Sequence, residues 1–237
     1  MKEDVKMNIH GLNKLTLLDY PGKVAATIFL GRCNFRCPFC HNGDLVLNPS
    51  SQPVIEEDDV LKFLKKRRSL LEGVCITGGE PTLYDGLEGL IRSIRDLGYA
   101  VKLDTNGYRP AVLKDLVEKG LLDMVAMDIK SDRDGYARVA GLDYLNLSNI
   151  EESVAFLMEG HVPYEFRTTV VKELHNKETF ENIGEWICGS EAYFLQCYKD
   201  SDHVIAPGFH ANTKEELEEY RQLLLDKIKH VSLRGID

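Results

Sequence analysis

Short β-rich runs alternate with helical patterns along most of this 237-residue chain, and this alternation limits the possible fold more than any other feature. The strand candidates are 24–30, 73–77, 99–104, 124–129, 164–171 and 193–197, and the helix candidates are 56–71, 87–97, 111–119, 150–158, 180–187 and 214–229. Strands separated by helices pair in parallel through right-handed crossovers. Because these units are too few for a closed eight-fold barrel, the sequence predicts an α/β fold, a partial (β/α)6 TIM-like barrel.

Two capping boxes mark helix starts in the sequence. Ser148 with Glu151 precedes the helix candidate at 150–158, and Thr213 with Glu216 precedes the last helix candidate. In such a box the first side chain accepts a hydrogen bond from the backbone N–H three residues on, and the second side chain returns the bond. We therefore expect both helices to begin at these residues.

The composition is that of a globular protein. With 43% hydrophobic residues and no Pro/Gly/Ser-rich linker, we expect one domain over 1–237, with a core at about 20–198 and a C-terminal helical segment at about 200–237. The formal net charge of −9 argues against a nucleic-acid partner, and the basic run 65–68 is interpreted as the solvated face of a helix. The amino terminus, MKEDVKM, precedes no signal-peptide core, and no apolar run approaches a membrane span. These features predict a soluble, cytoplasmic protein.

Three closely spaced cysteines, Cys33, Cys37 and Cys40, follow the first strand candidate directly. Soft thiolates packed this closely suit an iron–sulfur cluster, and three of them leave one iron of a four-iron cluster without a protein ligand. A structural zinc site is the main alternative, with His41 as the nearest fourth ligand, but His41 follows Cys40 immediately and a relaxed tetrahedron is awkward. The other cysteines lack ligand spacing and are interpreted as buried free thiols: Cys75, Cys188 and Cys197.

Polar groups follow the other strand candidates at the point where each strand ends. The second ends in Thr77-Gly78-Gly79-Glu80-Pro81, the third in Asp104-Thr105-Asn106-Gly107 and the fourth in Asp128-Ile129-Lys130, and Arg167 lies within the fifth. The carboxyl ends of parallel strands meet at one end of an α/β barrel, where active sites of such barrels are built. The sequence therefore predicts that these groups converge with the cysteines in one site.

The C-x3-C-x2-C spacing, the aromatic Phe39 before the last cysteine and the GGEP motif resemble the radical S-adenosylmethionine (SAM) superfamily. The resemblance implies a [4Fe–4S] cluster on Cys33, Cys37 and Cys40 whose open iron binds SAM. It also implies that reduction of the cluster cleaves SAM to methionine and a 5′-deoxyadenosyl radical, which removes a hydrogen atom from the substrate. The cofactors then carry the chemistry, and the protein binds and orients them.

The resemblance also implies roles for individual residues. The GGEP stretch would meet the amino group of SAM, Lys130 and Arg167 would balance its carboxylate, and the Phe39 backbone would face its adenine. A monovalent cation near that carboxylate is implied at Asp104 and Asp128. His41-Asn42 would support the cysteine loop. Where a similar enzyme has a histidine near the sixth strand that meets SAM, this chain would use Gln196 or Tyr198. The implied SAM contacts are Phe39, Gly78, Gly79, Glu80, Asp104, Thr105, Asn106, Asp128, Lys130, Arg167 and Gln196.

Within this superfamily, the pattern over about 11–198 resembles the glycyl-radical enzyme activating enzymes, and most closely the activating proteins of anaerobic (class III) ribonucleoside-triphosphate reductases. The resemblance implies a glycyl-radical enzyme as partner and a flavodoxin or ferredoxin as reductant. Asp19, in the DYPG segment, would lie near the glycine loop of the partner, or the segment would form only a hairpin before the first strand. The alternatives are another glycyl-radical partner (pyruvate formate-lyase type), a small molecule such as a deazapurine precursor, and a non-catalytic iron–sulfur or zinc protein.

Overall fold

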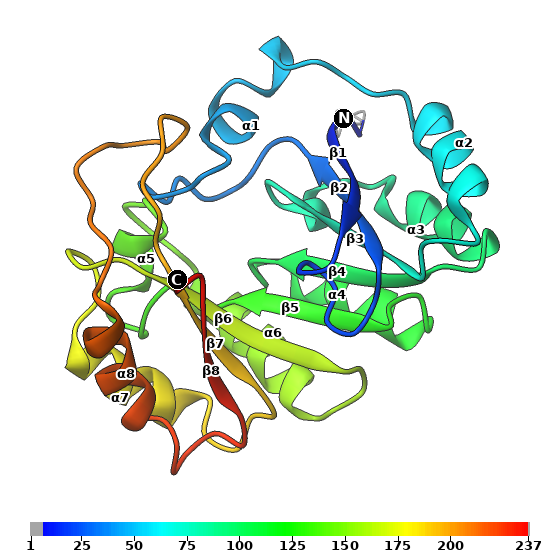
Figure 1. Cartoon of the computed structure of the whole chain (residues 1–237). Coiled ribbons are helices and arrows are strands. Elements are labelled where there is room, and N and C mark those ends of the chain that lie inside the picture. Colours follow the sequence, from blue (N-terminus) through cyan, green and yellow to red (C-terminus); the bar gives the residue numbers. More distant parts are fainter. Residues whose placement is uncertain (1–6, 237) are drawn as a thin grey trace.

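The computed structural model describes residues 7–236, and its centre is one eight-stranded sheet (Figure 1). The strands pair in chain order, with β1 antiparallel to β2 and every later pair parallel. Their bounds are β1 Ile9–Thr16, β2 Ala25–Leu30, β3 Gly73–Gly78, β4 Ala100–Thr105, β5 Met124–Asp128, β6 Tyr164–Val170, β7 Tyr193–Cys197 and β8 Val231–Arg234. This order confirms the predicted α/β fold, because β2 to β7 are the six predicted strands.

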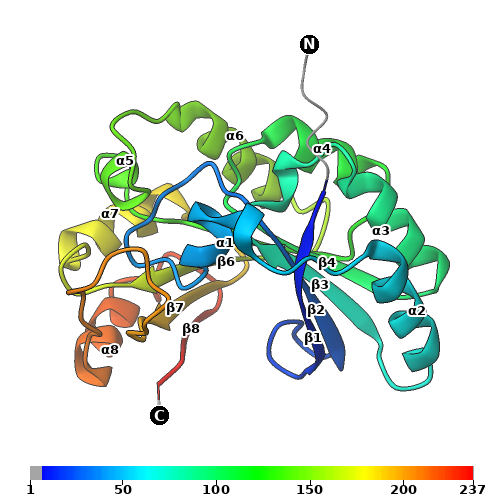
Figure 2. The ribbon, with the colours of Figure 1, turned by 90° about the horizontal axis from the view of Figure 1, so that it is seen from above.

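The helices form an outer arc around the strands, which curve as a partial barrel whose two ends are β1 and β8 (Figure 2). The helices of nine or more residues are α2 Glu57–Arg67, α3 Leu87–Asp96, α4 Pro110–Glu118, α6 Leu147–Met158, α7 Lys177–Trp186 and α8 Lys214–Gln222. Shorter pieces are α1 Gly43–Leu47 and α5 Tyr136–Val139, with 3-10 turns at Pro49–Ser51 and Pro81–Leu83. All six predicted helices are present, although α8 ends at Gln222 instead of continuing to residue 229.

Strands β1 and β8 were not predicted from the sequence. β1 carries Gly11 and Asn13 and three exposed positions, so its hydrophobic pattern is weak, and β8 has only four residues. β1 pairs with β2 as a hairpin, which was the competing interpretation of the DYPG segment. β8 adds to β7, so the C-terminal part extends the sheet as well as contributing the helix α8.

The strand period of two sorts the side chains of the sheet onto two faces. On β4, Val101 and Leu103 are fully buried in the hydrophobic core with the aliphatic residues of neighbouring strands and helices. Lys102 and Asp104 alternate with them and therefore lie on the opposite, inner face of the barrel. The parallel register then places Asp128 beside Arg167 on the same inner face. A polar barrel interior is thus a direct consequence of alternation within these strands.

The two predicted capping boxes have different outcomes. Thr213 accepts a hydrogen bond from the Glu216 N–H at 3.2 Å and Glu216 accepts from the Thr213 N–H at 2.8 Å, so the box at α8 is confirmed. The box at Ser148 is wrong, because α6 begins earlier, with Asn146 as its N-cap, and the Ser148 hydroxyl donates to the Asn146 side chain. A third box, Asn176 with Thr179 at α7, was missed because it lacks the Glu or Gln of the usual motif.

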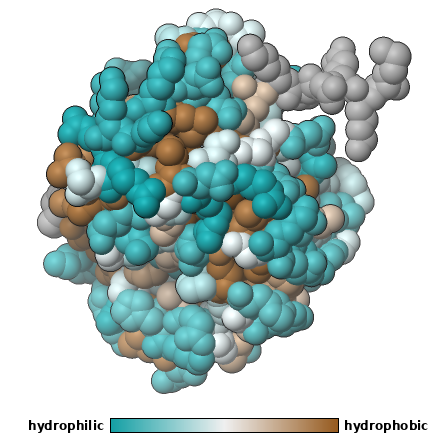
Figure 3. All heavy atoms as spheres, turned by 90° about the vertical axis from the view of Figure 1, so that its right-hand side faces the viewer, coloured by the Kyte–Doolittle hydropathy of each residue, from teal (hydrophilic) through white to brown (hydrophobic). Residues whose placement is uncertain are grey.

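The outer surface is that of a solvated globular protein. One side of the molecule is mostly hydrophilic, with hydrophobic residues in scattered patches (Figure 3). The basic run 65–68 at the end of α2 is exposed, as predicted. Across residues 7–236, no helix is both long and apolar enough to span a membrane. Most of the charged amino terminus, residues 1–6, lies outside the described residues.

The capping geometry predicts unequal effects of two alanine substitutions. Thr213→Ala removes a realised cap and is expected to lower the free energy of unfolding by about 1 kcal/mol. Ser148→Ala removes a hydroxyl that caps no backbone N–H, so we expect a change within about 0.5 kcal/mol. Urea unfolding of both variants and the wild type measures the difference. Equal losses in the two variants would contradict the assigned helix starts.

Candidate active site

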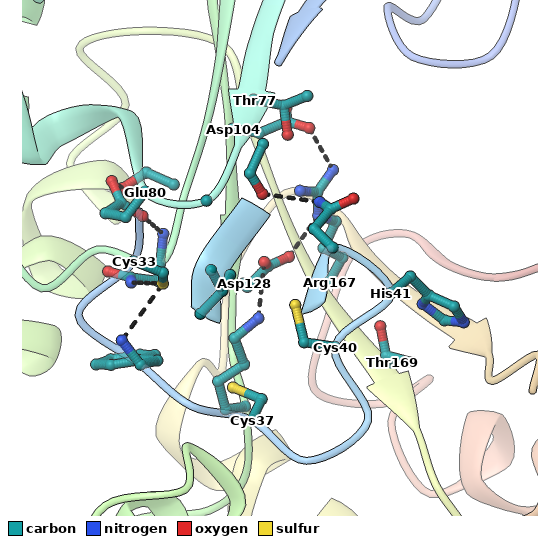
Figure 4. A pocket seen from close by; sticks show the side chains of 18 of the residues that line it. Cys33, Cys37, Cys40, His41, Thr77, Glu80, Asp104, Asp128, Arg167 and Thr169 are labelled. Atoms are coloured by element: carbon teal, nitrogen blue, oxygen red, sulfur yellow. Dashed lines mark hydrogen bonds and ion pairs between the residues drawn. The ribbon is translucent and has the colours of Figure 1, made fainter. Parts of the chain in front are cut away.

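A cavity of about 460 Å³ lies at the carboxyl ends of the parallel strands (Figure 4). Every residue predicted for the site lines it: Asp19, Cys33, Cys37, Phe39, Cys40, Gly78, Gly79, Glu80, Asp104, Thr105, Asn106, Asp128, Lys130, Arg167 and Gln196. The cavity size falls within the range of small-molecule sites, which is about 300–1,000 Å³. The fold therefore brings together groups from the β1–β2 loop and from the ends of β2 to β7.

The cysteine loop leaves β2 through a strained turn. Arg32 has a φ of 54°, the only left-handed non-glycine residue in the described part of the chain. Its N–H donates to the Leu45 carbonyl and its own carbonyl accepts from the Glu80 N–H, each at 2.8 Å. Further along, the Arg36 N–H donates to the Ala140 carbonyl at 2.9 Å, directly after α5. These backbone bonds hold the loop that carries all three site cysteines.

The segment between β7 and α8, in which the sequence showed no motif, packs on the other side of the cysteine loop. The Gly43 N–H donates to the His203 carbonyl at 3.2 Å, and the Ala206 N–H donates to the Pro38 carbonyl at 2.8 Å. His41 is hydrogen bonded through Nε2 to the Lys199 carbonyl. Since a carbonyl only accepts, the His41 imidazole donates this bond, which supports the cysteine loop, as predicted.

Burial favours the protonated form of all three site thiols. Burial raises the pKa of Cys33 to about 12 and that of Cys37 to about 11, and burial also raises the pKa of Cys40. Lys130 opposes this rise at Cys37 because its positive charge favours the thiolate. Metal ligation therefore displaces a proton from each thiol. Between residues 7 and 236, no three His, Cys, Asp or Glu side chains converge on the position of a single metal ion.

The glycine pair of the GGEP motif is required by the neighbouring backbone. Gly78 has a φ of +118°, and a Cβ on it would overlap the backbone of Leu30. A Cβ on Gly79 would overlap the carbonyl of Arg32. The Gly79 N–H also donates to the Leu30 carbonyl at 2.8 Å, and the Asn42 side chain donates to the Gly78 carbonyl at 2.8 Å. Glycine therefore lets the end of β3 lie directly against the start of the cysteine loop.

Glu80 links the GGEP turn to the end of β4. Its carboxylate is 1% exposed and accepts hydrogen bonds from the Thr105 hydroxyl at 2.7 Å and the Asn106 N–H at 2.6 Å. It also accepts from the backbone and hydroxyl of Thr82. Burial raises the pKa of Glu80, and these hydrogen bonds partly counter that rise. Glu80 thus fixes the loop from which Asn106 reaches the Cys33 sulfur at 3.8 Å.

Five charged side chains form a continuous series of ion pairs inside the barrel, which we call the ion ladder: Lys102, Asp104, Arg167, Asp128 and Lys130. Arg167 lies at its centre, donating from Nη1 to Asp104 Oδ2 at 3.0 Å and from Nε to Asp128 Oδ1 at 2.5 Å (Figure 4). Lys130 Nζ donates to Asp128 Oδ2 at 2.9 Å, and Lys102 Nζ donates to Asp104 Oδ1. Burial opposes ionisation of both aspartates, but the surrounding cations outweigh it and hold both pKa values below the usual range.

Other predicted and unpredicted residues complete the description of the site. Of the two candidates on the sixth predicted strand, Gln196 lines the cavity, whereas the buried Tyr198 donates its hydroxyl to Asp200. Thr77, expected at the end of the second predicted strand, also lines the cavity, whereas sequence reasoning missed three lining residues: Phe35, Val46 and Thr169. Thr169 was accessible to it, because it lies two positions from the inward Arg167 on the same strand.

The cysteines outside the site do not all behave as predicted. Cys75 is buried and Cys197 is half-buried, but Cys188 is exposed, so its assignment as a buried thiol is wrong. It follows Ile187 directly after α7, and there the chain turns toward solvent. His203 and His210 are also exposed, and each is paired with a carboxylate.

The fold and the site define a class of open α/β barrels. At the ends of their strands, three thiols lie close to cations that are paired with buried aspartates. The sequence model described as the radical SAM superfamily matches residues 27–187, and the chain belongs to this superfamily. Its cofactors are a [4Fe–4S] cluster and SAM. The residues fit them, because the three thiols of the cysteine loop would ligate three irons and leave the fourth for SAM.

Individual relatives agree with this assignment. The chain is 32% identical over 206 residues to MJ1227 of Methanocaldococcus jannaschii, named provisionally as a glycyl-radical enzyme activating enzyme, covering 84% of this chain and 82% of the relative. It is 30% identical over 154 residues to a protein of Thermococcus kodakarensis named provisionally as GTP 3′,8-cyclase, covering 64% of this chain and 48% of the relative. It is 29% identical over 139 residues to the pyruvate formate-lyase-activating enzyme of Clostridium pasteurianum, covering 56% and 57%.

A solved structure shows the same fold. SuiB of Streptococcus suis, bound to S-adenosylmethionine, superimposes with a TM-score of 0.67 over 86% of this chain and 48% of SuiB. Only 13% of the residues are identical, so this likeness concerns the fold alone. It agrees with the partial barrel described above.

Backbone packing at Gly79 predicts a specific loss of cluster binding. Gly79→Ala forces the GGEP turn away from the Arg32 carbonyl, and we expect anaerobic reconstitution to yield less than about half of the wild-type iron content. The matched control is Gly89→Ala on the exposed face of α3, where a Cβ meets no atom within 4 Å. This control should keep full iron content and gain about 0.5–1 kcal/mol of stability. Iron and sulfide analysis with thermal unfolding separates the two outcomes, and wild-type iron content in Gly79→Ala would disprove the packing argument.

Proposed function

We propose that this chain is an activase that abstracts a hydrogen atom from one glycine of a partner glycyl-radical enzyme. The observation that carries the proposal is the convergence in one cavity of three thiols, Asp19 and four members of the ion ladder: Asp104, Asp128, Lys130 and Arg167. When bound, the reduced [4Fe–4S] cluster and SAM supply a 5′-deoxyadenosyl radical. The cysteine loop would hold the cluster, and Arg167 and Lys130 would bind the SAM carboxylate through N–H groups that the aspartates leave free.

Asp19 is the candidate contact to the substrate glycine loop. It lies on the loop between β1 and β2, and its Oδ2 accepts a hydrogen bond from the Thr27 hydroxyl at 2.5 Å. The hairpin and the substrate role are thus compatible, because the hairpin itself brings Asp19 to the cavity. The second carboxylate oxygen remains available to accept a backbone N–H of an entering peptide.

The partner that we propose is an anaerobic, class III ribonucleotide reductase, with a flavodoxin or ferredoxin as reductant. The support is the resemblance of the DYPG, CNFRCPFCHN and GGEP motifs, together with the coverage of the activating-enzyme relative. An enzyme of the pyruvate formate-lyase type is the alternative partner. Because such a cluster is oxygen-labile, we place the activity in a reducing cytosol.

A small-molecule substrate is the second candidate function. Relatives named provisionally as GTP 3′,8-cyclase favour it, but the chain covers only 48% of the length of the first of them, against 82% of the activating-enzyme relative. About half of that relative lies outside the match. The comparison therefore supports the activase more strongly.

Electron paramagnetic resonance tests the proposal. The anaerobically reconstituted and reduced protein is mixed with SAM and a class III ribonucleotide reductase, and we expect a glycyl-radical doublet. Cys37→Ala should abolish the doublet because it removes a cluster ligand, whereas Cys188→Ala, which changes an exposed thiol outside the site, should leave it unchanged.

Asp19→Asn provides the more discriminating variant. We expect it to retain cleavage of SAM to 5′-deoxyadenosine while the yield of glycyl radical falls about tenfold, since the carboxylate would act on the substrate and not on SAM. Product analysis by chromatography runs beside the spectra. SAM cleavage with GTP, and no doublet with any glycyl-radical enzyme, would replace the activase by the small-molecule alternative.

A further inference from the structure

Lys102 is the one member of the ion ladder that does not line the cavity. Its side chain is 1% exposed on the inner face of β4, between the Asp104 carboxylate and the Cys75 sulfur, which lies 3.9 Å from Nζ. A buried lysine is costly unless its charge is matched. Here the Asp104 carboxylate neutralises the charge. The fold therefore keeps Lys102 below the cavity, where it cannot contact a ligand.

With Lys102 present, the ion ladder leaves no carboxylate oxygen unpaired. Asp104 uses Oδ1 for Lys102 and Oδ2 for Arg167, and Asp128 uses Oδ1 for Arg167 and Oδ2 for Lys130. A monovalent cation binds through such oxygens. The two aspartates therefore fit poorly the cation that the resemblance implied for them, because each of their oxygens already accepts a hydrogen bond from a cationic side chain of this protein.

The charges of the ion ladder do not cancel. Three cations face two carboxylates, so one positive charge remains, and Lys102 supplies the third cation. A further buried carboxylate, Glu165 on β6, is 2% exposed and paired through both oxygens with Arg234 at 2.7 and 2.8 Å, so it is neutralised separately. Two more carboxylates line the cavity: Asp19 accepts a hydrogen bond from the Thr27 hydroxyl, and Glu80 accepts four hydrogen bonds. Within the ion ladder itself, the surplus positive charge is available to a ligand at Arg167 and Lys130, the two ladder cations that line the cavity.

We propose that Lys102 is a positioning residue that neutralises Asp104 from inside the barrel and so replaces a monovalent cation in binding the carboxylate of SAM. Without Lys102, Asp104 has only Arg167 as a cationic partner, and the guanidinium is drawn from the cavity toward Asp104. With Lys102, Arg167 keeps its unused N–H groups directed at the ligand. This inference rests on the binding of SAM at the proposed site, but it does not depend on the identity of the substrate.

Equilibrium binding tests the role of Lys102. The reconstituted wild type, Lys102→Met and the exposed control Lys62→Met are titrated anaerobically with SAM and with decarboxylated SAM, in tetramethylammonium chloride and in potassium or sodium chloride of equal ionic strength. The wild type and Lys62→Met should bind SAM within about twofold in all three salts. Lys102→Met should lose about tenfold or more in tetramethylammonium, where no small cation can replace the missing charge.

Two further readouts separate this role from a merely structural one. Potassium or sodium should restore most of the SAM affinity of Lys102→Met, because a small cation can bind the freed Asp104 oxygen. Affinity for decarboxylated SAM should change by less than about twofold, since that ligand lacks the carboxylate. Circular dichroism and thermal unfolding show whether the variant folds.

The outcomes that overturn the inference are also distinct. Loss of SAM binding by the wild type in tetramethylammonium would show that a monovalent cation is required and that Lys102 does not replace it, and this result holds even if Lys102→Met fails to fold. Equal weakening of both ligands in Lys102→Met would reduce Lys102 to a structural residue. Failure of the wild type to bind SAM in any salt would instead overturn the proposed SAM site itself, and the inference with it.

Discussion

The pairing of buried charges inside the barrel is the interaction on which the site depends. The strand alternation that buries aliphatic residues under the helices necessarily directs Lys102, Asp104 and Arg167 into the interior, where an unpaired charge is strongly unfavourable. The register between strands resolves this problem by placing each carboxylate between two cations. Removal of any one of these cations would leave a carboxylate partly unpaired, so the ion ladder both neutralises the buried carboxylates and places cations at the cavity.

A second constraint is the contact between backbones at the start of the cysteine loop. Glycines at 78 and 79 allow the end of β3 to lie against Leu30 and Arg32, and two backbone hydrogen bonds join the two segments. The loop is also held by the backbone after α5 and by the segment between β7 and α8. Loops without such support are mobile, and a cluster needs its three thiols in fixed positions. The parts of the chain with no recognisable motif therefore contribute to the site by fixing the loop that has one.

These two constraints act together on function. The thiols of the cysteine loop and the cations Arg167 and Lys130 line the same cavity, which is a suitable arrangement for a ligand with an amino acid group. Membership of the radical SAM superfamily gives this arrangement its chemical meaning. The β1–β2 hairpin adds Asp19 from outside the parallel sheet, and the sheet order leaves the barrel open between β1 and β8. The proposed protein substrate would enter through that opening.

The sequence by itself determined the α/β fold, six of the strands, and every residue of the site that a motif could mark. It did so because period-two strands, capping residues and cysteine spacing are local patterns, as the realised box at Thr213 illustrates. It did not determine the edge strands β1 and β8, the helix start at Asn146 or the exposure of Cys188, where local signals are weak or misleading. Only the tertiary structure decided that Arg167 lies between both aspartates, and that Lys102 neutralises one of them from within. Such pairing depends on register between strands far apart in the chain, and no local pattern of residues encodes that register.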